Sequence, residues 1–173
     1  MKKTVAPALI LAAICLVVVS MLAFTNFLTE ERIEKEEKLA TERAARSVLS
    51  EAYTLSEITE EGFCGFIGYD EEENVVGYVF IHSHKGYGGD VTAIVGIDMN
   101  GRITGVSIQA PDETPGLGAN VSKDKYTSQF VGKDTVSDVD AVSGATYSSK
   151  AAEAAVSAAL ESFAAWKEGG MDK

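Results

Sequence analysis

The chain has 173 residues, of which 46% are hydrophobic and 24% are charged. This length is enough for one folded domain with an additional segment, and it is too short for two sizeable hydrophobic cores. The formal net charge of −11 excludes nucleic acid and anionic lipid as partners attracted by bulk charge. We therefore expect no nucleic-acid partner.

An apolar run near the N-terminus predicts a membrane anchor. Val5 to Phe24 is almost unbroken apolar sequence, and about twenty residues of helix span about 30 Å, the hydrocarbon thickness of a bilayer. A cleaved signal peptide is the alternative. We favour an uncleaved anchor because the run is long for a signal peptide and Met21-Leu22-Ala23 is a poor cleavage site.

The charges beside this run predict its orientation. Lys2 and Lys3 precede it, and no acidic residue does, so the short N-terminal flank should stay in the cytoplasm. The sequence thus predicts a single-pass protein of the cell (inner) membrane with an extracytoplasmic C-terminal domain.

A charged helical segment follows the anchor. Thr29 to Tyr53 is dense in Glu, Lys, Arg and Ala, and Thr29 is placed to cap a helix whose first turn holds Glu30 and Glu31. A modest apolar stripe recurs at helical spacing along it. We predict an anchor over residues 1–28, a stalk helix over 29–54 that lies against the domain, and the domain itself over 55–173.

The pattern then changes to that of strands. Residues 63–69 and 75–81 are rich in aromatic and β-branched side chains and flank a polar turn at 70–74, which predicts a hairpin. Residues 91–98 and 102–109 flank Asn100-Gly101, a dipeptide in which both residues can adopt positive φ. Two antiparallel hairpins are expected.

Loops and helices complete the domain. A glycine-rich loop is predicted at Lys85–Gly89 and an irregular loop at Pro111–Gly118. A short helix capped by Ser122 is predicted over 122–131, and a long Ala-rich helix over 147–166. Helices packed on an antiparallel sheet make an α+β domain.

Metal and disulfide chemistry is weakly supported. Cys15 lies in the anchor and Cys64 in the domain, so no internal disulfide is expected. His82 and His84 share one side of a strand but have no further His or Cys ligand nearby in the sequence, so we expect no metal site.

The segment from Asp140 to Ser149, DAVSGATYSS, places hydroxyls and small residues at the start of the last helix. Unpaired N–H groups and the positive end of the dipole make a helix start suitable for phosphate. The alternative is an ordinary Ser/Thr cap after a glycine turn. From the residues alone, the ordinary cap is favoured, because hydroxyl caps greatly outnumber phosphate sites.

Three segments of the chain resemble the FMN-binding domain family. Asp140 with Ser143-Gly144-Ala145-Thr146 is similar to its flavinylation motif, Glu113-Thr114-Pro115-Gly116-Leu117-Gly118 to a second hallmark, and Lys85-Gly86-Tyr87-Gly88-Gly89 to a third. Together with the anchor, these segments resemble the branch of G subunits of Rnf-type ion-translocating electron-transport complexes.

The resemblance implies FMN attached through a phosphoester to Thr146 by a dedicated flavin transferase. It implies cofactor contacts from Ser143, Gly144, Ala145, Glu113, Thr114, Gly116, Leu117 and Tyr87, with Asp140 in the flavinylation motif. It also implies an electron-transfer subunit that is not catalytic alone, whose partners are the other subunits of such a complex.

Two other functions remain possible on the sequence. The first is a standalone extracytoplasmic flavoprotein electron carrier, or a subunit similar to the C subunit of the sodium-pumping NADH:quinone reductase. The second is an anchored binding module without a cofactor, in which residues 143–146 are only a helix cap.

Overall fold

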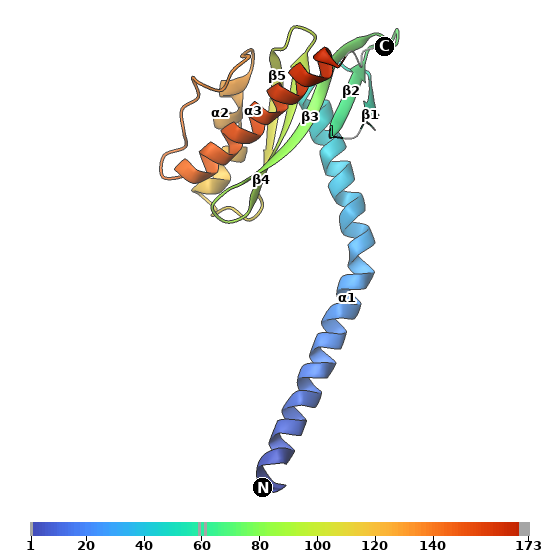
Figure 1. The fold of residues 1–173 in the computed structure, drawn as a ribbon, viewed down its shortest axis with the longest axis vertical. Coiled ribbons are helices and arrows are strands. Elements are labelled where there is room, and N and C mark those ends of the chain that lie inside the picture. The colour runs from blue at the N-terminus through green and yellow to red at the C-terminus, as the bar shows by residue number, and fades with distance from the viewer. Residues whose placement is uncertain (1, 59, 61, 170–173) are drawn as a thin grey trace. The chain divides into compact units, whose positions relative to one another are not determined.

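A computed structural model describes residues 2–58, 60 and 62–169 (Figure 1). One antiparallel sheet has the strand order β1-β2-β3-β4-β5. Its strands are β1 (Thr54–Glu57), β2 (Gly65–Tyr69), β3 (Val75–Lys85), β4 (Asp90–Asp98) and β5 (Ile103–Gln109). The two predicted hairpins, β2–β3 and β4–β5, are confirmed, and the domain is α+β as predicted.

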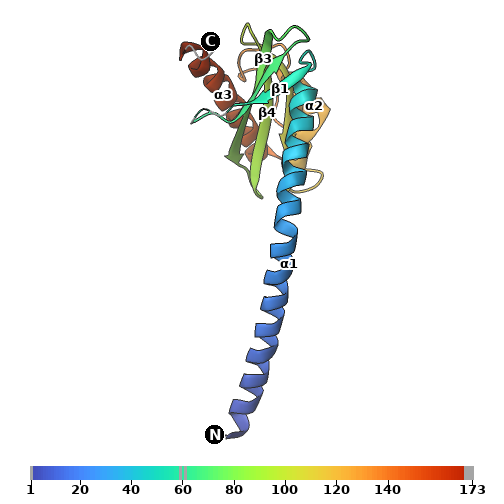
Figure 2. The ribbon, with the colours of Figure 1, turned by 90° about the vertical axis from the view of Figure 1, so that its right-hand side faces the viewer.

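Helices cover both faces of the sheet (Figure 2). On one face, α3 (Thr146–Glu168) packs its apolar side on β3 and β4, and Trp166 lies in a cluster with Tyr78 and Phe80. On the other face, the C-terminal end of α1 (Lys2–Val48) contributes to a second cluster that includes Leu49 and Val79. Because neighbouring strand residues point to opposite faces, consecutive residues of β3 enter different clusters.

The β4–β5 turn differs in detail from the prediction. Gly101 has a φ of +85°, whereas Asn100 does not have a positive φ. Instead, Asp98 Oδ1 accepts hydrogen bonds from the backbone N–H groups of Asn100 at 2.8 Å and Arg102 at 2.9 Å. The Asp98 side chain thus adds to two backbone hydrogen bonds that close the turn, from the N–H of Asp98 to the Arg102 carbonyl oxygen at 2.9 Å and from the N–H of Gly101 to the Asp98 carbonyl oxygen at 3.0 Å.

The single helix predicted over 122–131 is replaced by three short pieces, η1 (Gly118–Ser122), α2 (Asp124–Thr127) and η2 (Ser128–Phe130). Ser122 does not cap a helix; Lys123, in extended conformation, precedes α2, and no side chain caps it. The extended backbone of Lys123, with a ψ of 147°, separates η1 from α2. The core buries Tyr126 and Phe130 of this segment together with Val121, which precedes it.

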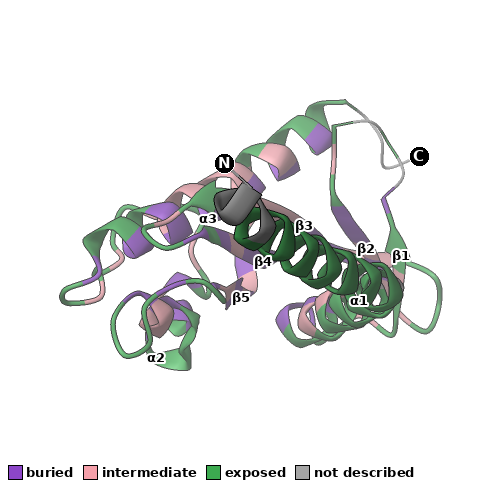
Figure 3. Cartoon of the chain, turned by 90° about the horizontal axis from the view of Figure 1, so that it is seen from below, coloured by how far each residue is buried: buried purple, intermediate pink, exposed green. Residues whose placement is uncertain are grey.

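The residues divide into two compact units, 1–40 and 41–173. Helix α1 is continuous from Lys2 to Val48, so no separate stalk helix begins at Thr29, whose Oγ1 donates to the carbonyl oxygen of Thr25 at 2.8 Å as in a helix interior. Among the described residues, one stretch, Pro7–Glu30, is long and apolar enough to cross a membrane, and it is exposed throughout (Figure 3).

Candidate functional site

The side chain of Glu113 joins three segments that are far apart in the sequence. Its Oε1 accepts hydrogen bonds from the backbone N–H groups of Tyr87 at 2.7 Å and Gly88 at 3.2 Å. Its Oε2 accepts a hydrogen bond from Ser148 Oγ at 2.8 Å. The loop of residues 85–89, the loop of residues 113–118 and the start of α3 therefore meet at one carboxylate that is 3% exposed.

This carboxylate is charged at neutral pH. Burial is the largest influence on the pKa of Glu113 and raises it, but hydrogen bonds from Ser148, Gly88, Tyr87 and Gly89 together outweigh burial and lower the pKa below its ordinary value. An ionised carboxylate only accepts hydrogen bonds, and here its known partners all donate. Glu113 therefore acts as a fixed anchor for the loops.

Glycines permit this close packing. A Cβ on Gly86 would overlap Glu113 Oε1, and a Cβ on Gly118 would overlap Glu113 Oε2. Glycine is thus required at both positions by the approach of the carboxylate rather than by backbone conformation. Gly116 is different, because its φ of +80° lies in the region that favours glycine while the space beside it is open.

Thr146 is the first residue of α3 and is exposed. The N-cap position is Ala145, and no side chain caps the helix. The preceding turn is held by its backbone, with Gly144 at a φ of +77° and the N–H of Ala145 donating to the carbonyl oxygen of Val142 at 2.9 Å. Neither Thr146 nor Ser143 is therefore a helix cap, and Thr146 is exposed at the positive end of a long helix.

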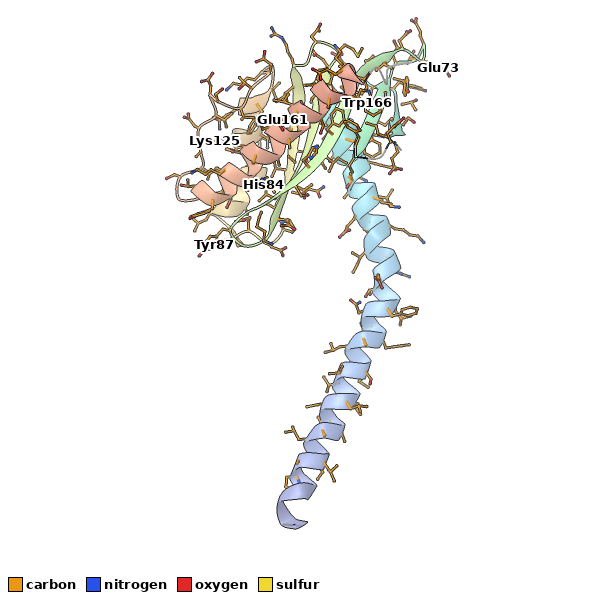
Figure 4. All side chains as sticks on the ribbon, in the orientation of Figure 1. Glu73, His84, Tyr87, Lys125, Glu161 and Trp166 are labelled. Carbon is orange, nitrogen blue, oxygen red and sulfur yellow. The ribbon has the colours of Figure 1, made fainter. Side chains whose placement is uncertain are left out.

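Exposed apolar side chains lie on the segments that meet in this region. Tyr87 is 76%, Tyr147 73% and Leu117 48% exposed. The rings of Tyr87 and Tyr147 are 6.4 Å apart between centroids, and a Cβ on Gly144 would lie 3.4 Å from Leu117 Cδ2. Figure 4 shows Tyr87 at the end of the β3–β4 hairpin, directed away from the body of the domain. Large exposed apolar groups that converge on one point are typical of a binding site.

A cleft of about 730 Å³ opens beside the same turn. One wall is formed by residues of η1, α2 and η2 and the other by residues 140–143, which include Asp140 and Ser143. The Gln129 side chain spans the two walls: its Oε1 accepts from the backbone N–H of Asp140 at 2.9 Å, and its Nε2 donates to the Asp140 carbonyl oxygen at 3.3 Å. The Asp140 side chain is exposed.

The residues predicted for the site largely gather in one region. Glu113, Tyr87, Leu117 and the segment 143–146 are linked by the contacts above, and Thr114 holds the intervening loop by accepting from the N–H groups of Leu117 and Ala119. Sequence reasoning missed Tyr147, Ser148, Asn120 and Gln129. Ser148 and Tyr147 stand inside the recognised segment, whereas no local signal marks Asn120 or Gln129.

Comparison with known proteins assigns the chain to a family. Residues 86–161 match the FMN-binding domain family, and residues 1–48 match the RnfG N-terminal region. The G subunit of the ion-translocating oxidoreductase complex of Methanosarcina acetivorans is 30% identical over 168 residues, which cover 87% of this chain and 89% of that protein. The chain belongs to this family of G subunits. The G subunit of the Na⁺-translocating ferredoxin:NAD⁺ oxidoreductase complex of Acetobacterium woodii is 29% identical over 184 residues, which cover 90% and 89% of the two chains.

Other matches are partial. The G subunit of the proton-translocating ferredoxin:NAD⁺ oxidoreductase complex of Clostridium ljungdahlii is 36% identical over 97 residues, and the match covers 50% of this chain and 52% of that protein. Among solved structures, the C subunit of the Na⁺-translocating NADH-quinone reductase from Parabacteroides distasonis is similar with a TM-score of 0.49 and 24% identity, covering 57% of this chain and 59% of that one.

Proposed function

We propose that this member of the G-subunit family carries FMN esterified to Thr146 and relays electrons within a membrane-bound complex that couples electron transfer to ion translocation. The chain is a translocase subunit and is not catalytic alone. Its partners are the other subunits of an Rnf-type complex and, during maturation, a flavin transferase. A standalone electron carrier would use the same chemistry. Co-purification distinguishes the two functions, because only a subunit of a complex should bring integral membrane subunits with it.

One observation carries this proposal. Thr146 is exposed and is the first residue of a 23-residue helix that no side chain caps, and it lies inside the segment that matches the FMN-binding domain. The residues present fit a phosphoester there. Ser143, Gly144 and Ala145 leave room beside the hydroxyl, and a helix start favours the negative charge of phosphate. Exposed Tyr87, Tyr147 and Leu117 offer apolar surface to a flat ring.

The proposed attachment reaction is a phosphoryl transfer in which every atom and charge is accounted for. The Thr146 oxygen forms a bond to the FMN phosphorus of FAD, the pyrophosphate bond breaks, and AMP leaves with the electron pair and takes up the hydroxyl proton. No atom changes its oxidation state in this step. Asp140, Gly144 and Ala145 would be recognised by the transferase, because they lie on the exposed turn beside the acceptor or support it.

When bound, FMN supplies transfer of one or two electrons at a time. The residues of this chain would hold it in place: Glu113 fixes the loops, and Leu117 and Thr114 stand on the loop that borders the turn of residues 143–146. A covalent bond also prevents loss of the cofactor outside the cell.

We also propose that residues 1–28 anchor the chain in the cell membrane with the N-terminus in the cytoplasm. Residues 29–54 then form a stalk and residues 55–173 an extracytoplasmic FMN-binding domain. Lys2 and Lys3 before the apolar stretch Pro7–Glu30 support this orientation.

The test is in-gel flavin fluorescence on denatured full-length protein made in a host that contains a flavin transferase, together with the intact mass. The wild-type chain should fluoresce and carry the added mass of one FMN residue. Thr146→Ala should lose both completely, because it removes the acceptor oxygen.

Matched variants separate this result from misfolding. Ser143→Ala removes the neighbouring hydroxyl and should still fluoresce, and Thr146→Ser keeps an acceptor oxygen and should regain part of the signal. A bare wild-type chain under these conditions, or a fluorescent Thr146→Ala band, would rule out the proposed attachment.

A further inference from the structure

Residues 140–145, which lead to the proposed acceptor, lie outside the helices and strands but are held by side chains from two other elements. From η2, the Gln129 amide binds the backbone of Asp140. From α3, the buried Ser149 accepts a hydrogen bond on its Oγ from the backbone N–H of Val142 at 2.9 Å. The segment is therefore fixed at its first residue by η2 and at its third by α3.

The contact between Gln129 and Asp140 uses both peptide groups that flank the α-carbon of Asp140. Gln129 Oε1 accepts from the N–H of Asp140 at 2.9 Å, and Gln129 Nε2 donates to the Asp140 carbonyl oxygen at 3.3 Å. The reverse orientation of the amide would lose both hydrogen bonds, because it would set donor against donor and acceptor against acceptor. Since the backbone of a residue turns only about φ and ψ, holding both of its peptide groups also fixes the direction of its Cα–Cβ bond.

The side chain whose direction is fixed in this way is an exposed carboxylate. The Asp140 carboxylate forms no hydrogen bond or ion pair with any residue that the structure describes. Gln129, in contrast, is half-buried. The two hydrogen bonds therefore direct an unpaired charge toward solvent, six residues before Thr146, and do not serve to pack that side chain inside the domain.

We propose, on the basis of the proposed attachment at Thr146, that Gln129 is a positioning residue for this reaction and presents the Asp140 carboxylate to the flavin transferase. An enzyme that modifies a folded chain binds the surface around the acceptor, and an unpaired carboxylate on that surface can pair with a positively charged group of the enzyme. A carboxylate that is already oriented loses less conformational freedom on binding. Gln129 acts through Asp140 and takes no part in the phosphoryl transfer itself.

The test is a kinetic assay of flavin attachment to the full-length chain in detergent, purified from a host without a flavin transferase. Purified transferase and saturating FAD are added, and the concentration of the chain is varied. Gln129→Met removes both hydrogen bonds and keeps the length of the side chain. It should raise the KM for the chain roughly tenfold, because only a fraction of the molecules then presents Asp140 in the direction that is bound. The kcat should change by less than about twofold, since Thr146 is unaltered.

A double-mutant cycle shows whether Gln129 acts through Asp140. Asp140→Ala alone should raise the KM at least as much as Gln129→Met does. In the Asp140→Ala background, Gln129→Met should add less than about twofold, because no carboxylate is left to present. Ser128→Ala, at the exposed position beside Gln129 on η2, is the control and should leave KM and kcat unchanged in both backgrounds.

The positioning contact can also be measured without flavin. In the unmodified full-length chain, the hydrogen bond to Gln129 should protect the N–H of Asp140 from hydrogen exchange. Gln129→Met should speed this exchange roughly tenfold. The thermal unfolding temperature should stay within about 4 °C of wild type, because the contact lies at the surface of the domain.

The outcomes separate this inference from the proposed function. A wild-type chain that accepts no flavin from the transferase rules out both. A wild type that accepts flavin, together with an unchanged KM or an unchanged Asp140 exchange rate in Gln129→Met, overturns the inference alone. An effect of Gln129→Met that appears in kcat, or that adds in full to the effect of Asp140→Ala, also overturns it. Asp140 is exposed, so Asp140→Ala is informative even if Gln129→Met fails to fold, and an unchanged KM in Asp140→Ala likewise overturns the inference.

Discussion

Glu113 is the residue on which the arrangement of the site depends. It gathers backbone donors from the β3–β4 loop and a hydroxyl donor from α3, and it is itself in the loop after β5. A buried carboxylate with several donors is stable as an anion, but its removal leaves those donors without a partner. The turn of residues 143–146 is thus supported by a charged group with which it forms no direct hydrogen bond.

Replacing Glu113 should therefore cost stability. Glu113→Ala leaves the N–H groups of Tyr87 and Gly88 unpaired and should lower the free energy of unfolding by roughly 2–4 kcal/mol. Glu113→Gln keeps an acceptor and should cost less. Urea denaturation measures both, and Glu57→Ala, an exposed glutamate on β1, should stay within about 0.5 kcal/mol of wild type. A Glu113→Ala variant as stable as the wild type would contradict the role of Glu113 in holding the loops together.

The contribution of Glu113 to stability should depend on pH, and its pKa determines the direction of this dependence. Because the pKa of Glu113 is lower in the folded than in the unfolded chain, its contribution is fully present above the unfolded value near 4.5 and is lost as pH falls through the folded pKa. The stability gap between wild type and Glu113→Gln should accordingly be constant above about pH 5 and shrink below it.

For single residues, the sequence predicted candidates that belong to a contiguous motif. It missed residues that only the folded structure places beside them. Thr146, Leu117 and Glu113 were named as candidates because their segments carry recognisable patterns. Asn120 and Gln129 were not, because their roles come from contacts with residues 116 and 140 that no local pattern encodes. Ser148 looks like one of several serines until its contact with Glu113 is seen.

Among the elements, the contact of α3 with β3 includes a titratable side chain, His82. His82 Nε2 lies 2.8 Å from Ser162 Oγ between the sheet and the helix. Burial lowers the pKa of His82 below 6.5, and the nearby Glu161 carboxylate opposes this effect. The neutral imidazole is therefore favoured when α3 is docked.

Docking of α3 should weaken in mild acid. A folded pKa below the unfolded value means that the unfolded chain binds more protons, so stability falls as pH drops through about 6.5 towards the folded pKa. Thermal unfolding between about pH 7.5 and 5 should show this slope, and His82→Asn should reduce it. His84→Asn, which changes the other of the two histidines at an exposed position, should leave it intact. An unchanged slope in His82→Asn would assign the effect to other groups.

The elements were predicted where one local pattern dominates. Strands β2 to β5 combine β-branched or aromatic residues with clear turns, and α3 is rich in strong helix formers. Strand β1 was missed because Thr54–Glu57 is short and mostly exposed, and it is ordered by pairing with β2 rather than by its own pattern. The pieces from η1 to η2 were missed because no local pattern marks the extended backbone of Lys123, which interrupts the predicted helix.

For the whole molecule, the second compact unit begins at Thr41, within α1. Ala45, Val48 and Leu49 are buried against Phe66, Val79 and Ile94 of the sheet. The C-terminal end of the proposed stalk thus belongs to the core of the domain. A truncation at residue 41 should therefore remove the proposed membrane anchor and leave the folded domain intact. A truncation at residue 55 should not, because it also removes part of the core of the domain.

Truncation tests this division. A fragment of residues 41–173 should be soluble without detergent and unfold as cooperatively as the detergent-solubilised full chain. A fragment of residues 55–173 should be markedly less stable, because it exposes one apolar face of the sheet; loss of Leu49 alone is worth about 2–5 kcal/mol. Thermal unfolding followed by circular dichroism compares them. Equal stability of the two fragments would contradict the packing of Ala45, Val48 and Leu49 against the sheet.

The carboxylate of Glu113 also sets an order of events in the life of the chain. Its partners lie 26 and 35 positions away, at Tyr87 and Ser148, so the acceptor turn acquires its shape only after the hairpin, the intervening loop and the last helix have come together. We expect the unfolded polypeptide to be a poor recipient of the cofactor. Under the proposed function, only chains that have been exported and have folded would then carry the flavin.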